Sequence, residues 1–415
     1  MKKDVVLQPS FYDDFACIGG ACQNDCCHGW NIDFTKEEFK NVKKKIHTDA
    51  FKEVFQDAFK FEKGICRIKL DEKGNCKFLN EDGLCKMYIE VGHDNMSVTC
   101  KIFPRMLTKY IDGYERFLSI ACEKVVDLLL EQSDGIELEA KEIELSKLEK
   151  GHAMLYSAIV VEQNKYLQLW NDMKILLLGV LQCREYRFGE RMVLLGLATQ
   201  KIEELFEQKE IEKIQNYIQN FIVEIEQNKQ VYTEFFQKIN RDGKIRASQT
   251  SMYHLPNLKG SAIEQKIKER IDFKSEYEFK PESKENNNIE MKLSLSTEYD
   301  NKKYQQAIAD FEEFLKDKEY WIENIMIEGF LATRGFYRVK GGFWRNYCAL
   351  AVTYSVILFV LTCCLEKDST KEDFKKYVTE IARTMFHNEQ HTKQLEEHLK
   401  ETESDSLAHI AVLVL

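Results

Sequence analysis

The residues of this chain with the clearest chemical potential are cysteines near its N-terminus. Nine of its thirteen cysteines lie within the first 122 residues, and four of them, Cys17, Cys22, Cys26 and Cys27, fall within eleven positions. Small and polar residues separate these four. Their thiolates can therefore close around a soft metal ion or an iron–sulfur cluster without much backbone strain. The spacing predicts metal chemistry for this part of the chain.

A second set of cysteines is more widely spaced and consists of Cys76, Cys85, Cys100 and Cys122. Together the two sets supply eight candidate metal ligands, enough for two four-thiolate sites or for one cluster and a structural zinc. The adjacent Cys26 and Cys27 point in different directions if extended, so they can reach separate sites. Cys66 belongs to either set or to neither. The remaining cysteines fit better as buried apolar side chains: Cys183, Cys348, Cys363 and Cys364.

Two domains are expected to position these residues. The chain has 415 residues, of which 44% are hydrophobic and 31% charged, so it can bury substantial cores. Residues 1–130 are rich in cysteines and turns and predict a metal-binding domain with short hairpins. Residues 146–415 show helical periodicity and predict a large helical domain with a flexible insertion near 274–300. The expected fold class is therefore mainly α.

Local signals place elements around the cysteines. Thr35 and Glu38 form a capping-box pattern at the start of one or two amphipathic helices that run to residue 60. Alternating residues on either side of a turn at 71–74 predict a small hairpin over 66–79. A second turn at 80–83 would present Cys85.

Charge and hydropathy restrict the function classes. The net charge of −10 argues against a general nucleic-acid binder. The apolar run after Met1 is too short for a secretory signal, so we expect a cytoplasmic protein with reduced cysteines. Residues 346–365 carry no charge, but polar side chains interrupt them, so we expect a buried core helix and no membrane span. The nucleotide-binding and hydrolase patterns GxGxxG, GxxxxGK[ST] and GxSxG are missing, which argues against a Rossmann-type site for a methyl donor.

Four segments together resemble the flagellin lysine-N-methylase family: residues 22–30, 76–85, 99–105 and 118–123. The first part of the chain is also similar to the wider family of zinc- or iron-chelating cysteine domains. Weaker similarity to the helical body of the methylase family continues at residues 184–191 and 381–388.

This resemblance implies transfer of a methyl group from S-adenosylmethionine to lysine side chains of flagellin, with the cysteines holding a [4Fe–4S] cluster. Arg105 is the candidate to neutralise the carboxylate of the methyl donor or the charge of the cluster. A neutral lysine amine is also needed, and the acidic candidates near the cysteines that could accept its proton are Asp25, Glu81, Asp82 and Glu123. None is assigned as the base. Two alternatives stay open: a non-catalytic adaptor that binds zinc or iron, and an iron–sulfur redox sensor.

Overall fold

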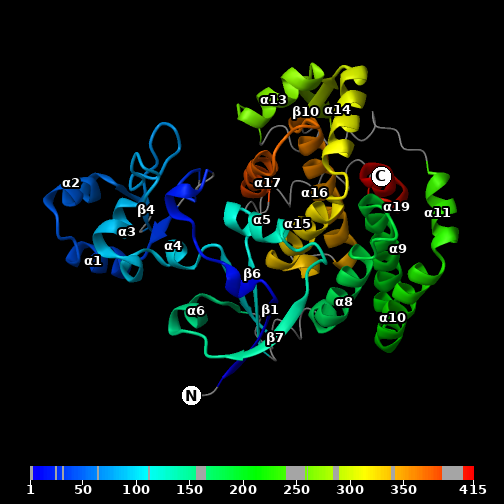
Figure 1. Ribbon diagram of the computed structural model, residues 1–415, viewed down its shortest axis with the longest axis horizontal. Helices are drawn as coiled ribbons and strands as arrows, with labels where there is room; N and C mark the ends of the chain where they lie inside the picture. The colour runs from blue at the N-terminus through cyan, green and yellow to red at the C-terminus, as the bar shows by residue number, and fades with distance from the viewer. Residues whose placement is uncertain are drawn as a thin grey trace. The chain divides into compact units, whose positions relative to one another are not determined.

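The fold consists of two compact units (Figure 1). The computed structural model describes residues 3–23, 26–29, 32–62, 65–110, 113–155, 165–239, 258, 260–283, 289–337, 342–385 and 405–415. Unit 1 comprises Met1–Gln132 and Ile136–Val160, and unit 2 comprises Ser133–Gly135 and Val161–Leu415. Unit 1 contains the cysteine-rich stretch with short strands, and unit 2 is built mainly of helices. The fold class expected from the sequence is thus confirmed.

The first part of unit 1 packs short helices against a three-stranded sheet of order β2-β4-β3. The strands are β2 (Asp33–Phe34), β3 (Phe59–Glu62) and β4 (Ile65–Ile68), and the helices are α1 (Lys36–Lys44), α2 (Asp49–Asp57), α3 (Lys86–Val91) and α4 (Val98–Ile102). The predicted capping box is confirmed at the start of α1. The Glu38 amide donates to Thr35 Oγ1 at 3.1 Å, and the Thr35 amide donates to Glu38 Oε2 at 2.7 Å.

Aromatic side chains form the core of this part of unit 1. Phe55 and Phe59 lie 4.9 Å apart between ring centroids, Phe59 lies 5.7 Å from Phe78, and all three rings are buried. Cys66, on β4, is buried in the same cluster. We call this cluster the phenylalanine core. Several of the candidate ligands belong to it or pack against it.

A five-stranded sheet of order β7-β1-β6-β5-β8 completes unit 1. Its strands are β1 (Asp4–Pro9), β5 (Arg105–Lys109), β6 (Tyr114–Leu118), β7 (Leu138–Ile143) and β8 (Met154–Leu155), with α5 (Glu123–Leu130) and α6 (Lys147–His152) between them in sequence. β1 pairs in parallel with β6 and antiparallel with β7, and β8 pairs in parallel with β5. β7 and β8 therefore belong to the first unit, whereas the sequence placed the helical domain from residue 146.

Unit 2 is a helical body arranged around one long helix, α16 (Gly342–Cys364), which packs against α9, α13, α14, α17 and α19. The other helices are α8 (Trp170–Leu181), α9 (Phe188–Glu207), α10 (Ile211–Gln227), α11 (Lys229–Gln237), α13 (Ala262–Ile271), α14 (Asn301–Phe314), α15 (Glu319–Ala332), α17 (Lys371–Met385) and α19 (Leu407–Val414). Among the described residues, α16 is the one helix long and apolar enough to cross a membrane, and it is mostly buried in unit 2. This burial is the behaviour expected of a core helix.

The stretch 274–300, predicted as a flexible insertion, contains two paired strands. β9 (Lys274–Ser283) and β10 (Ile289–Glu298) form an antiparallel ribbon that is in register from Lys274 opposite Glu298 to Ser283 opposite Ile289. The insertion therefore carries secondary structure of its own between α13 and α14.

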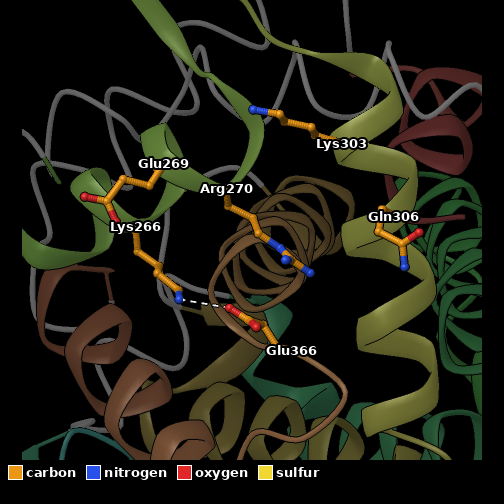
Figure 2. A pocket seen from close by; sticks show the side chains of 6 residues that line it. All are labelled: Lys266, Glu269, Arg270, Lys303, Gln306 and Glu366. Carbon is orange, nitrogen blue, oxygen red and sulfur yellow. Dashed lines mark hydrogen bonds and ion pairs between the residues drawn. The ribbon is translucent and has the colours of Figure 1, made fainter.

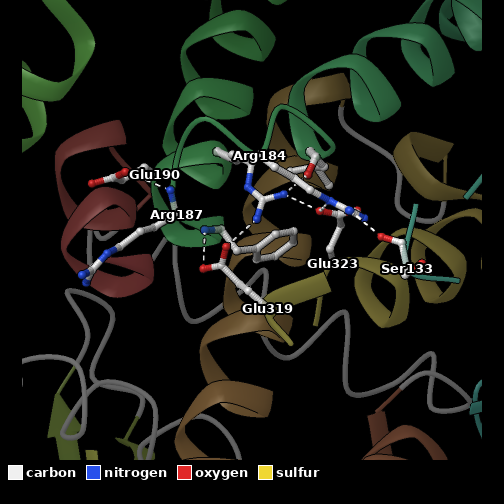
Figure 3. Close-up of polar contacts among 9 residues, drawn as sticks. Ser133, Arg184, Arg187, Glu190, Glu319 and Glu323 are labelled. Carbon is white, nitrogen blue, oxygen red and sulfur yellow. Dashed lines mark hydrogen bonds and ion pairs between the residues drawn. The ribbon is translucent and has the colours of Figure 1, made fainter. Parts of the chain in front are cut away.

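A buried ion network joins the start of α9 to α15 (Figure 3). Arg191 is 1% exposed and contacts Glu323 at 2.5 Å and Glu319 at 2.7 Å, while Glu323 is fully buried. Arg184 reaches the other oxygen of Glu323 at 2.8 Å and donates to the Ser133 carbonyl at 2.5 Å. These arginines lie in segment 184–191, which resembles the family's helical body. Their role in the structure is to connect the start of α9 to α15 through these ion pairs.

We predict that Arg191→Met lowers the free energy of unfolding of unit 2 by about 3–5 kcal/mol, because breaking a buried ion pair leaves Glu323 under-compensated. Urea unfolding followed by tryptophan fluorescence measures this, since three of the four tryptophans (Trp170, Trp321 and Trp344) lie in unit 2. The control is Lys229→Met, which removes an exposed pair with Glu185 and should cost about 0–1 kcal/mol. Equal costs for the two variants would contradict the assigned role.

Candidate metal centre

Two tight turns place Cys76 and Cys85. In the first turn, Asp71 Oδ1 accepts hydrogen bonds from the amides of Lys73 and Asn75, both at 2.8 Å. The chain on either side of this turn pairs through a β-bridge between Leu70 and Cys76. In the next turn Asn80 Oδ1 accepts the Leu84 amide at 2.7 Å. Leu79 then bridges Cys85. Such side-chain-to-backbone bonds are the reason that Asp and Asn favour turns. The predicted turn before Cys85 is confirmed. Of the hairpin predicted over 66–79, the turn and the bridge between Leu70 and Cys76 form, whereas β4 pairs with β2 and β3 instead.

The segment that carries Cys27 lies alongside the first of these turns. The Cys76 amide donates to the Cys27 carbonyl at 2.7 Å, and the Gly29 amide donates to the Gly74 carbonyl at 2.9 Å. His28 Nδ1 lies 2.9 Å from Asn75 Oδ1. These contacts fix the backbone of Cys27 beside Cys76, although the two residues are far apart in the sequence.

Four cysteines form a set that we call the inner thiols: Cys27, Cys76, Cys85 and Cys100. The Cys27 thiol is hydrogen-bonded to the thiols of Cys26, Cys76 and Cys85. Cys100 lies near the start of α4, where its amide donates to Ser97 Oγ at 3.2 Å, and it interacts electrostatically with Cys85 and Cys76. All four inner thiols belong to the phenylalanine core or pack against it.

The hydrogen bonds among the inner thiols separate their pKa values. A hydrogen bond from Cys27, assisted by the amides of Tyr88 and Met87, lowers the pKa of Cys85 to about 7. The bond from Cys27 also lowers the pKa of Cys76, whereas the bonds to its thiol neighbours raise the pKa of Cys27 itself. Burial raises the pKa of Cys100 to about 12. Thiolate character, the form that binds metals, is thus favoured at Cys85 and Cys76.

The remaining cysteines of the predicted site form a second set, which we call the outer thiols: Cys17, Cys22, Cys26 and Cys122. Cys22 interacts with Cys122 and Cys26, and Cys122 interacts with Cys26 and Cys17. Cys17 and Cys26 are exposed. Cys122 immediately precedes α5, and the amides of Val125 and Lys124 donate to its sulfur. Burial nevertheless raises its pKa to about 11.

Glu123 ties the outer thiols to the start of α5. Its Oε2 accepts the Gln23 amide at 2.9 Å and lies 3.6 Å from Cys22 Sγ. Burial, followed by the charge of Glu123, raises the pKa of Cys22 to about 12. Glu123, one of the acidic candidates named from the sequence, is only 4% exposed. Its position directly after Cys122 in the sequence was the signal that it lies beside the outer thiols.

Two cysteine-bearing loops approach each other closely at Gly20. A Cβ atom at Gly20 would lie 2.8 Å from the Asp82 carbonyl oxygen and 3.2 Å from Leu84 Cδ2. Only a residue without a side chain allows the turn around Gly20 to approach the turn before Cys85 so closely.

Each of the eight predicted cysteines interacts electrostatically with at least one other of the set, whereas the Cys66 thiol is influenced by Asp33. Eight sulfur donors suit a soft, thiophilic metal or an iron–sulfur cluster, so the residues present fit such a group. The thiols hydrogen-bond to one another, and no group of three or more Cys, His, Asp or Glu side chains in the described ranges is already arranged as a metal site.

The other predicted residues take different places. Arg105, half-buried, stacks its guanidinium 4.9 Å from the Phe15 ring centroid and donates to the Phe15 carbonyl at 3.5 Å, two residues before Cys17. Glu81 and Asp82 are exposed in the turn before Cys85, and Asp25 lies outside the described residues.

Among the described residues of unit 2, two of the cavities have volumes of about 410 Å³ each. Three cations line the first (Figure 2), and each has a carboxylate partner: Lys266 with Glu366 at 3.1 Å, Lys303 with Asp272 at 2.7 Å, and Arg270 with Asp310. The second cavity lies beside the buried ion network, with Phe188 and Glu319 in its wall. The charged residues of the first cavity are therefore accounted for by their ion pairs. Packing alone does not account for the concentration of thiols in unit 1.

Comparison with known proteins identifies the family. Residues 174–413, more than half of the chain, match the FliB lysine N-methylase C-terminal domain. The chain belongs to the FliB lysine N-methylase family. Residues 16–123, which include all eight inner and outer thiols, match the CxxCxxCC zinc- or iron-chelating domain. The methylase resemblance seen in the sequence is thereby confirmed.

Individual relatives from Salmonella match over 148 residues, which is 34% of this chain. The lysine-N-methylases of Salmonella choleraesuis and Salmonella typhimurium are each 34% identical to it, and the match spans 37% of their length. The flagellar biosynthetic protein FliU of Salmonella muenchen is 35% identical over 86% of its length. No solved structure matches the chain.

We predict that Gly20→Ala weakens metal retention, because the added methyl group pushes the two loops apart. Overpacking of this kind costs about 1–3 kcal/mol. Metal content after gel filtration, measured together with the melting temperature, checks this. The control is Gly151→Ala on α6, where an added Cβ meets nothing within 4 Å. Wild-type metal content and melting temperature in Gly20→Ala would refute the proposed contact.

Proposed function

We propose that this protein is a lysine N-methyltransferase that transfers methyl groups from S-adenosylmethionine to lysine side chains of flagellin, and that unit 1 holds a [4Fe–4S] cluster required for the transfer. The observation that carries the proposal is the convergence of eight thiols in a chain of the FliB lysine N-methylase family.

The family and the names of the relatives support the reaction and its substrate. Two relatives are named lysine-N-methylase, and a third is named a flagellar biosynthetic protein. A lysine-bearing flagellar protein is therefore the substrate class that fits both names. The lack of a glycine-rich nucleotide fingerprint agrees with a methyl donor that is held in a different way.

The donor atoms support the cluster. Cysteine thiolates are the usual ligands of [4Fe–4S] clusters, and here they come from short turns in which backbone amides donate to the sulfurs of Cys85 and Cys122. The cysteines would hold the cluster, which would supply Lewis-acidic iron for binding the methyl donor.

Residues of the chain itself would position the donor. Arg105 places a permanent positive charge beside the loop that leads into Cys17, where it can pair with the donor carboxylate. Glu123 holds the Cys22 segment through its bonds to Gln23 and Cys22, so we assign it as a positioning residue. The acceptor lysine must be neutral to attack the methyl carbon, since an ammonium has no lone pair.

The direct test is incubation of anaerobically purified protein with flagellin and S-adenosylmethionine. We expect flagellin peptides to gain methyl groups on lysine, as read by mass spectrometry, and we expect no gain when the methyl donor is omitted. A protein that retains its full metal content but leaves flagellin unmodified would overturn the proposed function.

A second prediction concerns Arg105. Arg105→Met should weaken binding of S-adenosylmethionine by about tenfold or more, because a charge-assisted hydrogen bond contributes about 1.5–3 kcal/mol. The methionine keeps an apolar stem over Phe15, and calorimetric titration gives the affinity. Lys109→Met removes a cation from the same strand, where it lies over the Tyr114 ring, and should leave the affinity unchanged. Unaltered donor binding in Arg105→Met would exclude Arg105 from the donor site.

A further inference from the structure

We propose that the second cavity of unit 2 is a docking site for the protein substrate. It would hold a segment in which a large apolar side chain lies next to a lysine. We call this cavity the α14 cavity, because α14 supplies one of its walls. The identity of the occupant as flagellin rests on the proposed function, whereas the cavity and its charges are features of unit 2 alone.

Helices from five parts of unit 2 form the walls of the α14 cavity. α14 contributes Ile308, Phe311, Glu312 and Leu315, whose spacing of three or four residues places them on one face of the helix. α16 contributes residues at a spacing of four, and the start of α9, the start of α15 and the end of α19 complete the walls. Because the walls are helical, the cavity is formed before any ligand binds.

The floor of the α14 cavity is apolar. Phe188, Phe311 and Tyr354 all line the cavity and are all buried. The rings of Phe188 and Tyr354 lie 5.2 Å apart between centroids in an edge-to-face arrangement. The cavity volume of about 410 Å³ lies within the range of about 300–1,000 Å³ that is typical of binding pockets. A large apolar side chain of a partner therefore fits this floor.

The charges at the α14 cavity favour a cation beside that apolar side chain. Its lining contains the carboxylates of Glu190, Glu312 and Glu319 but the guanidinium of only one residue, Arg187. Glu319 is occupied, since it accepts the Phe188 amide at 2.9 Å and pairs with Arg191. Glu312 is exposed and takes part in no ion pair within the described part of unit 2. A lysine next to the apolar anchor would pair with Glu312.

Arg187 suits the backbone of an extended segment. It is exposed, and in the residue ranges given above it makes no ion pair. Figure 3 shows its side chain extending away from Glu190 and Glu319. A guanidinium has five N–H donors and can bind the carbonyl oxygens of a peptide. The α14 cavity thus combines an apolar floor, an anion for lysine and a donor for the backbone, whereas the cations of the first cavity are paired.

The test is the binding of unmodified flagellin to anaerobically purified full-length protein without the methyl donor, together with KM and kcat for methylation. Glu312→Lys reverses an exposed charge at the cavity. Its matched control is Glu313→Lys, the same change one residue further along α14 and outside the cavity lining. Ile308→Trp fills the cavity, and its control is Ile175→Trp, at an exposed isoleucine of α8.

Glu312→Lys should weaken flagellin binding and raise KM by about five- to tenfold, because it replaces an attraction with a repulsion of similar size. Ile308→Trp should weaken binding by about tenfold or more, because the apolar anchor loses its pocket. We expect kcat, metal content and the affinity for S-adenosylmethionine to stay at wild-type values in both variants. Both controls should bind flagellin as the wild type does.

Wild-type flagellin affinity in either cavity variant, an equal loss in its control, or no binding of flagellin by the wild type would overturn the proposal. Weaker binding of S-adenosylmethionine with unchanged binding of flagellin would assign the cavity to the methyl donor and would also overturn it. If Ile308→Trp fails to fold, the comparison of Glu312→Lys with Glu313→Lys still decides. A protein that binds flagellin through this cavity but transfers no methyl group would refute only the proposed function.

Discussion

Interaction among thiols from four separate segments is the constraint on which the rest of unit 1 depends. Apolar contact between neighbouring thiols adds little to the stability of the fold. Other interactions must therefore hold their backbones in place. Backbone amides that donate to Asp71 and Asn80 set two turns, and the close approach of Gly20 to Asp82 brings a third loop against them. Glu123 attaches the loop after Cys22 to α5. The inner thiols belong to the phenylalanine core or pack against it.

The two units are stabilised by different interactions. Unit 2 stabilises itself through a long buried helix and through ions that are paired inside it, as the contacts of Arg191 with Glu319 and Glu323 illustrate. Unit 1 has a smaller aromatic core and a high concentration of thiols, so bound metal would add to its stability as well as to its chemistry.

Features with local causes could be predicted from the sequence. The capping box of Thr35 and Glu38, the turns before Cys76 and Cys85, the burial of α16 and the family all followed from short patterns. Pairings between distant segments could not be predicted. The parallel pairing of β1 with β6 and the return of β7 and β8 to the same sheet moved the boundary of unit 1 to residue 160. The interactions between distant thiols and the burial of Glu123 depend on the same long-range packing.

X-ray absorption spectroscopy at the zinc and iron edges tests the central claim most directly, since it reports the atoms bound to each metal in the intact protein. Convergence of the eight thiols on soft metal predicts a first shell made of sulfur, with zinc–sulfur distances of about 2.3 Å. A first shell of nitrogen and oxygen at about 2.0–2.2 Å would contradict the account, because the thiols would then not be the ligands.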